Sequence, residues 1–145
     1  MTLYRAASRA TIAPATFGRG ACFAQRREDA ERYTRNPGFG GAHLFAFAVE
    51  PEYVLQVGRG RVALETLARE LDFAPETVDR WLDAGLCEAY EVLEERAEVA
   101  RRVAECYDWL VYEEPQAGED GARFGARTCR TWRYFGSRPL VGRLS

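Results

Sequence analysis

Residues 43–57, HLFAFAVEPEYVLQV, hold two apolar runs separated by Pro51, and these runs decide the fold class. Phe, Val and Tyr are enriched in β-strands, so we expect strands at His43–Glu50 and Tyr53–Val57. From Val62 to Cys106 the apolar residues recur every three to four positions, which is the spacing of amphipathic helices. Strands followed by a run of helices indicate an α+β fold.

Further elements are expected on both sides of this region. A helix is expected at Arg26–Arg35, because Asn36-Pro37-Gly38 is a strong breaker directly after it. Strands are expected at Leu3–Ala7, Ala21–Ala24, Trp109–Tyr112 and Thr128–Phe135, with a glycine-containing loop at Glu113–Ala126. The sequence shows no repeat or linker, so we expect one domain over residues 1–145 with a helical insertion at 62–106.

The insertion is expected to hold three helices. The first presents an apolar stripe that includes Leu64 and Leu67. The second begins near Pro75 and ends at Gly85, since proline suits a first helical turn and glycine the position after a helix. The third runs from Glu88 to Cys106.

Composition and charge limit the classes of function. The chain has 145 residues, is 47% hydrophobic and carries a net charge of −2, which excludes a uniformly basic nucleic-acid binder. Nine Arg against five acids give residues 1–61 a net charge of +4, whereas two Arg against six acids give residues 62–86 a charge of −4. Three Arg against six acids give residues 87–106 a charge of −3. The helical insertion is therefore strongly acidic.

The four cysteines indicate neither a disulfide framework nor a zinc site. They lie far apart without a CxxC pair, and His43 is the only histidine. The chain opens without a secretion signal and has no long apolar run, so we expect a cytoplasmic protein that spans no membrane. The cysteines are expected to act as small buried hydrophobes.

One stretch of the insertion, Leu67–Leu82, is similar to a helix-turn-helix. Its second helix would carry Glu76, Asp79 and Asp83 against Arg80, and this charge would repel DNA. We therefore expect a helical hairpin without direct nucleic-acid binding, while a non-catalytic binding or regulatory module stays an alternative. The acidic face could also dock on a basic partner, or it could simply be solvated.

Candidate chemistry lies at two places. The N-terminal half is basic and aromatic and could hold an anionic, planar ligand. Glu113 and Glu114 close a strand just before the glycine-containing loop. A positioned carboxylate can orient a ribose hydroxyl and stabilise oxocarbenium-like charge, which suits cleavage of a glycosidic bond. Because strand residues alternate between faces, at most one of the two is expected to point into a site.

Several short motifs resemble those of small ADP-ribosyltransferases, and among them the phage anti-CRISPR enzymes that act on the type I-F CRISPR surveillance complex. They are Leu3-Tyr4-Arg5, the segment FGRGACFA at residues 17–24 with the helix after it, and Thr128-Cys129 in the late strand. The resemblance implies a split β-sheet and an NAD-dependent protein mono-ADP-ribosyltransferase that needs no metal. The implied partners are NAD, as ADP-ribose donor, and a protein acceptor in the host cytoplasm, for which a subunit of a CRISPR surveillance complex is one candidate.

The resemblance also implies roles for individual residues. Tyr4 and Arg5 would bind NAD, with Arg5 on the diphosphate or the adenosine ribose. Phe23 and Tyr33 would line the nicotinamide or stack on it. Glu114, or its neighbour Glu113, would polarise the nicotinamide ribose. Each residue also has a structural alternative: Arg5 as an outward side chain on an edge strand, the two rings as packing, and the carboxylates as solvated groups.

The chain departs from the broader family near its final strand. It has no Glu-x-Glu there, and Arg127, Arg130 and Arg133 occupy that region. The acid must then come from Glu113/Glu114 or from Glu119/Asp120, or the protein binds NAD without cleaving it. An NAD glycohydrolase toxin of related fold is a further alternative.

Overall fold

The computed structural model describes residues 1–13, 18–35, 43–115 and 128–145. The helices are α1 (Arg27–Thr34), α2 (Gly60–Glu70), α3 (Glu76–Asp83), α4 (Ala89–Glu95) and α5 (Ala97–Cys106). The strands are β1 (Thr2–Ala7), β2 (Thr11–Ile12), β3 (Ala21–Ala24), β4 (His43–Ala48), β5 (Val54–Gly58), β6 (Trp109–Pro115), β7 (Thr128–Tyr134), β8 (Leu140–Val141) and β9 (Arg143–Leu144). The α+β class expected from the sequence is confirmed.

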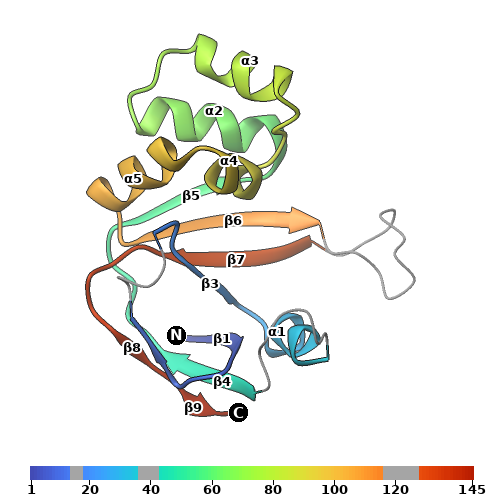
Figure 1. The fold of residues 1–145 in the computed structure, drawn as a ribbon, viewed down its shortest axis with the longest axis vertical. Helices are drawn as coiled ribbons and strands as arrows, with labels where there is room; N and C mark the ends of the chain where they lie inside the picture. The colour runs from blue at the N-terminus through green and yellow to red at the C-terminus, as the bar shows by residue number, and fades with distance from the viewer. Residues whose placement is uncertain (14–17, 36–42, 116–127) are drawn as a thin grey trace.

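Seven of the described strands form one mixed sheet in the order β5-β6-β7-β3-β1-β4-β9, and β2 pairs with β8 beside it. The pair β5–β6 is parallel, and the other described pairs are antiparallel. Parallel neighbours need a long crossover connection. Helices α2 to α5 supply it, so the expected insertion leaves the sheet after β5 and returns to the adjacent strand β6 (Figure 1).

The sheet has an apolar core on each face. Residues of α2–α5 pack with β5 and β6 on one face, around Leu64, Leu67 and Leu110. Helix α1 packs against β1, β3 and β4 through Ala30. The opposite face buries Phe23, Phe47, Trp109 and other residues of β1, β3, β4, β6 and β7, together with Ile12 of β2.

Helix α1 and helix α4 lie on the same face of the sheet. The register pairs Tyr112 with Thr131, Thr131 with Ala24, and Ala24 with Tyr4. Directly paired strand residues point to the same side of a sheet. Tyr112 belongs to the core under α2–α5, whereas Tyr4 and Ala24 pack with α1. These two helical blocks therefore flank the central strands β7 and β3 on this face.

Most expected elements are found, and the differences have physical reasons. Strand β6 continues to Pro115, beyond the expected end at Tyr112, because β7 pairs with it along its whole length. The two-residue strands β2, β8 and β9 were not expected. Two residues are too few to show an alternation of apolar and polar positions, and such short strands form only because a neighbouring strand pairs with them.

The expected helix from Glu88 to Cys106 is wrong: it is two helices. Arg96 adopts an extended conformation between α4 and α5, with φ −123° and ψ 90°. No proline or glycine lies in this stretch, so its local sequence continues a helical pattern. Tertiary contacts decide the break, because α4 begins against the start of α2, where the Gly60 amide donates to Glu88 at 2.8 Å. Helix α5 instead bonds the end of α2, where Arg102 donates to the Leu71 carbonyl at 2.7 Å.

The second helix of the insertion agrees with its expected signals. Pro75 precedes the first residue of α3, and Gly85 follows its end with φ +84°. A positive φ at the position after a helix favours glycine because it has no Cβ. The exposed side of α3 carries the acids expected there, and Ala68 of α2 is buried where the two helices pack.

We expect Leu67→Ala to lower the free energy of unfolding by about 2–5 kcal/mol, because Leu67 is fully buried between the helices and the sheet. Val62 on the same helix is 65% exposed, so Val62→Ala should change stability by less than about 0.5 kcal/mol. Urea titration of both variants checks this. Equal effects would show that α2 does not bury the face described.

Candidate functional site

On the face of the sheet that carries α1 and α4, the strands between these helices line a cavity of about 440 Å³. Its floor contains one residue from each of four neighbouring strands, and these residues are in register: Tyr112 of β6, Thr131 of β7, Ala24 of β3 and Tyr4 of β1. Because each faces the same side, the four strands together present a continuous surface. The cavity volume lies within the usual range for small-molecule sites.

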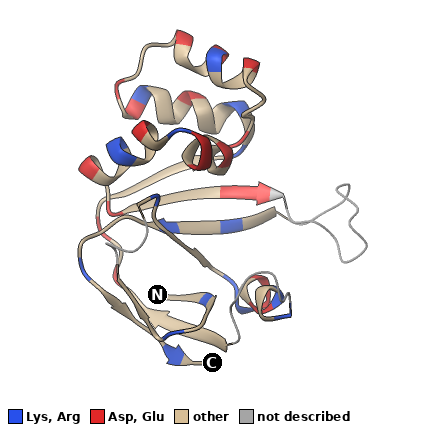
Figure 2. Cartoon of the chain, viewed as in Figure 1, with Lys and Arg blue, Asp and Glu red and all other residues tan. Residues whose placement is uncertain are grey.

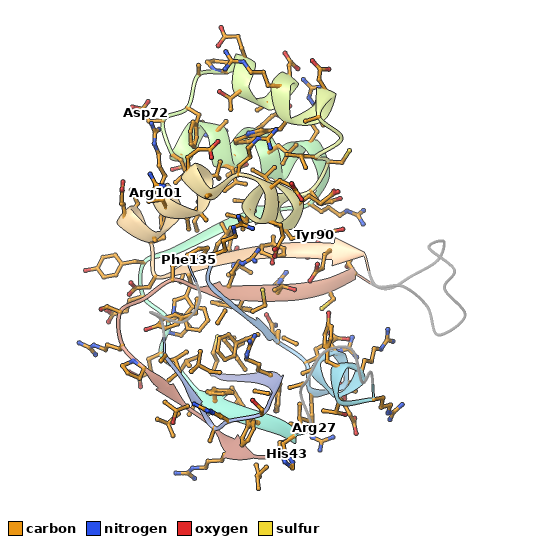
Figure 3. The ribbon with its side chains drawn as sticks, in the orientation of Figure 1. Arg27, His43, Asp72, Tyr90, Arg101 and Phe135 are labelled. Carbon is orange, nitrogen blue, oxygen red and sulfur yellow. The ribbon has the colours of Figure 1, made fainter. Side chains whose placement is uncertain are left out.

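Two helices form the walls of the cavity. Helix α1 contributes Ala30 and Tyr33 on one side, and α4 contributes Tyr90 and Glu94 on the other. Tyr90 stacks on Tyr112 with ring centroids 6.5 Å apart, so α4 is fixed to the cavity floor by an aromatic contact. Figure 3 shows Tyr90 between α4 and β6. The wall on this side belongs to the helical insertion.

Glu114 lines the cavity, as does Glu94 on the α4 wall. The Thr131 hydroxyl donates a hydrogen bond to Glu114 Oε1 at 2.6 Å across the β6–β7 pair. Burial raises the pKa of Glu114, while this hydrogen bond and the positive charge of Arg133 act in the opposite direction. The carboxylate is thus partly desolvated and has a fixed orientation.

Glu113 does not line the cavity. Its carboxylate pairs with Arg130 at 3.3 Å, and the register places these two residues opposite each other on the other face of the sheet. Alternation along β6 therefore separates the two carboxylates that the sequence left as alternatives. Glu119 and Asp120, the other candidate acids, lie outside the described residues.

Arg5 enters the cavity through a gap in the strand pairing. Strands β1 and β3 share a single register pair, Tyr4 with Ala24, whereas β3 pairs with β7 over its whole length. Arg5 Nη1 donates to the carbonyl oxygen of Cys22 at 2.6 Å, so the guanidinium takes a position that a strand-to-strand bond would otherwise fill. Arg5 is not an outward side chain on an edge strand.

The two aromatic residues expected at a ligand differ in their placement. Phe23 is among the residues that line the cavity, as expected. Its ring is 1% exposed and packs edge-on against Phe47 at 5.0 Å, so the expected stacking of this ring on a ligand does not fit its burial. Tyr33 is 46% exposed on α1. The pKa of Tyr33 is raised to about 12, which keeps its hydroxyl protonated. Partial desolvation is the largest cause, and the negative charge of Glu114 is the next.

A buried arginine under α4 was not expected from the sequence. Arg133 is 3% exposed, and it donates to Glu94 of α4 at 2.6 Å and to the Tyr112 hydroxyl at 3.5 Å. Burial alone would lower the pKa of Arg133, but Cys22, Tyr112 and Glu94 raise it by more. The net pKa is therefore raised, and the guanidinium stays charged. Arg133 faces α4 because residues along β7 alternate between the two faces of the sheet. The sequence shows this alternation, but only the pairing with the neighbouring strands tells which face α4 covers.

Three further observations complete the site. Cys22 and Cys129 line the cavity, whereas Cys87 and Cys106 are exposed, so the expectation that the cysteines are buried hydrophobes is wrong for these two. Within the described residues, no group of His, Cys, Asp or Glu could hold a metal ion. No helix in those same residues is long and apolar enough to cross a membrane.

Comparison with known proteins gives no identification. No protein-family model, no curated protein and no solved structure matches the chain.

We expect Glu114→Gln to raise the melting temperature at about pH 8, because a carboxyl whose pKa is raised in the folded state opposes folding once it ionises. The gain should shrink as the pH falls through that pKa, since the buried carboxyl is then protonated and neutral. Glu113→Gln is the matched control, and its exposed ion pair with Arg130 predicts little change. Thermal melts between about pH 5 and pH 8 check this.

Proposed function

We propose that the cavity binds NAD and that the protein is an NAD-dependent mono-ADP-ribosyltransferase of the split-sheet type acting on a protein side chain. One observation carries the proposal: Tyr4, Arg5, Tyr33 and Glu114, which lie far apart in the sequence and to which the sequence motifs assign ligand contacts or catalysis, line one cavity. Their juxtaposition comes from three separate elements, β1, α1 and β6. Such a convergence of cationic, aromatic and carboxylate groups suits a charged, planar ligand with a ribose.

The residues present fit the chemical groups of NAD. The Arg5 guanidinium is a suitable donor to a diphosphate oxygen, and Tyr4 and Tyr33 offer aromatic surface to a planar ring. Tyr90, contributed by the insertion, and Tyr112 on the floor add further aromatic side chains to the lining, whereas the ring of Phe23 is buried. When bound, NAD supplies a glycosidic bond to a cationic nicotinamide, a good leaving group.

In this proposal Glu114 is the catalytic carboxylate. The Thr131 hydrogen bond fixes one of its oxygens and leaves the other to accept a bond from a ribose hydroxyl. A carboxylate held there stabilises positive charge as it develops on the sugar, and partial burial strengthens that effect. Tyr33 stays protonated near Glu114 and can donate a hydrogen bond to the same ligand.

The other functions considered for the sequence receive less support. A DNA-binding helix needs cationic side chains on its exposed face, whereas α3 exposes Glu76, Asp79 and Asp83 with Arg80. Arg61 is already paired with Glu65 at 2.9 Å and with Asp79 at 3.4 Å. Glycohydrolase activity would use the same cavity, with water in place of a protein acceptor, and the test below distinguishes it.

Calorimetry with NAD and chromatographic assay of released nicotinamide test the proposal together. We expect the wild type to bind NAD, and Glu114→Gln to retain binding but to lose at least about 100-fold in cleavage rate. Glu113→Gln should retain both, because its side chain faces away from the cavity. Loss of cleavage in both variants, or in neither, would remove the catalytic assignment of Glu114.

Two controls define what a positive result means. Arg5→Ala should weaken NAD binding, and circular dichroism must show that losing the bond to Cys22 has not unfolded the sheet. Transfer is distinguished from hydrolysis with labelled NAD, since label retained on protein indicates a transferase and free ADP-ribose alone indicates a glycohydrolase. Absence of NAD binding in the wild type would remove the proposal.

The pH dependence of NAD cleavage should show an acid limb above the usual pKa of a glutamate, because Glu114 must be ionised to act and its pKa is raised. Thr131→Val removes the hydrogen bond that favours the ionised form. We therefore expect this limb to move to higher pH in Thr131→Val, with the plateau rate less affected. A limb that moves to lower pH would contradict the assigned interaction.

A further inference from the structure

A second cavity of about 460 Å³, which we call the groove, lies on the helical insertion beside the first cavity. The loop after α3 contributes Ala84 and Leu86, and α4 contributes most of the remaining lining. Tyr90 and Glu94 line both cavities, so the groove shares part of its wall with the candidate NAD site. Anything seated in this groove would be held next to the proposed site of bond cleavage.

The lining of the groove is suited to a long cationic side chain. Glu91, Glu94 and Glu95 line it with a single cation, Arg96. Leu86 and Ala84 provide apolar surface for a methylene stem, and the three glutamates supply negative charge for the cationic end. Figure 2 shows that acidic residues concentrate on α4, within an insertion whose overall charge is strongly negative.

Two of the three carboxylates of the groove are held in place by the fold. Glu91 Oε1 accepts from the backbone amides of Glu88 at 3.1 Å and Cys87 at 3.3 Å, at the start of α4. Glu94 Oε1 accepts from Arg133 at 2.6 Å, which fixes the carboxylate between the two cavities. A preorganised group loses less conformational entropy on binding than a mobile one.

We propose that this groove binds an arginine or lysine side chain of the partner protein and so holds that protein beside the NAD cavity. The inference rests on the proposed function, in which the partner is the acceptor of ADP-ribose. Charge complementarity favours a cationic polypeptide, and the same charge repels nucleic acid.

Fluorescence anisotropy with a labelled short peptide, whose only charged residues are arginines, tests the groove at low ionic strength. We compare Glu95→Arg with Glu105→Arg, since both exposed glutamates lie in the last turn of their helices and undergo the same charge change. Glu105 does not line the groove. We expect Glu95→Arg to weaken binding at least about fivefold and Glu105→Arg less than about twofold.

Equal weakening by the two reversals would assign binding to overall charge and overturn the groove, as would absence of peptide binding to the wild type. Calorimetry with NAD on the same proteins keeps the two proposals apart. NAD binding without groove-dependent peptide binding would overturn this inference alone. Groove-dependent peptide binding without NAD binding would remove the proposed function and leave the acidic, cation-binding groove in place.

Discussion

The buried guanidinium of Arg133 connects the parts of the molecule that form the candidate site. It lies on β7, donates to the hydroxyl of Tyr112 on β6, and reaches Glu94 on α4. Glu94 is 54% exposed at its side chain, so this ion pair spans the boundary between the interior and water. A charge this deeply buried requires partners, and the requirement fixes where α4 can lie on the sheet. The wall that α4 contributes to both cavities depends on this contact.

Pairing geometry explains why a cavity exists on this face at all. The parallel pair β5–β6 carries the helical crossover at one end of the sheet, and α1 covers the other end. Between them β1 and β3 share one register pair, so Arg5 satisfies the Cys22 carbonyl with its guanidinium. Arg5 thereby lines the same cavity as Glu114 and Tyr33.

The division of charge along the chain becomes a division in space. The basic N-terminal half contributes Arg5 to the first cavity, while the acidic insertion supplies the glutamates of the second. Glu94 belongs to both cavities and is neutralised from below by Arg133. An anionic small molecule and a cationic protein side chain could therefore occupy neighbouring sites with favourable electrostatics at each.

The sequence by itself determined the α+β class, the positions of the longer elements, the acidic character of the insertion and the start and end of α3. These features are local: apolar period, turn residues and charge can be read from neighbouring positions. The break at Arg96 and the burial of the Phe23 ring could not be read in this way, because each depends on which distant segment packs against it.

For the candidate site, alternation along a strand was enough to predict that Glu113 and Glu114 face opposite sides. Only the tertiary structure decided which of them faces the cavity, because that choice depends on the pairing of β6 with β7 and on the helices that cover one face. It also added Thr131, Arg133 and the α4 residues Tyr90 and Glu94, whose relevance lies in contacts across long sequence separations. The sequence pattern shows which residues of one strand or helix share a face. The site depends in addition on how separate strands and helices pair and pack, which the pattern does not contain.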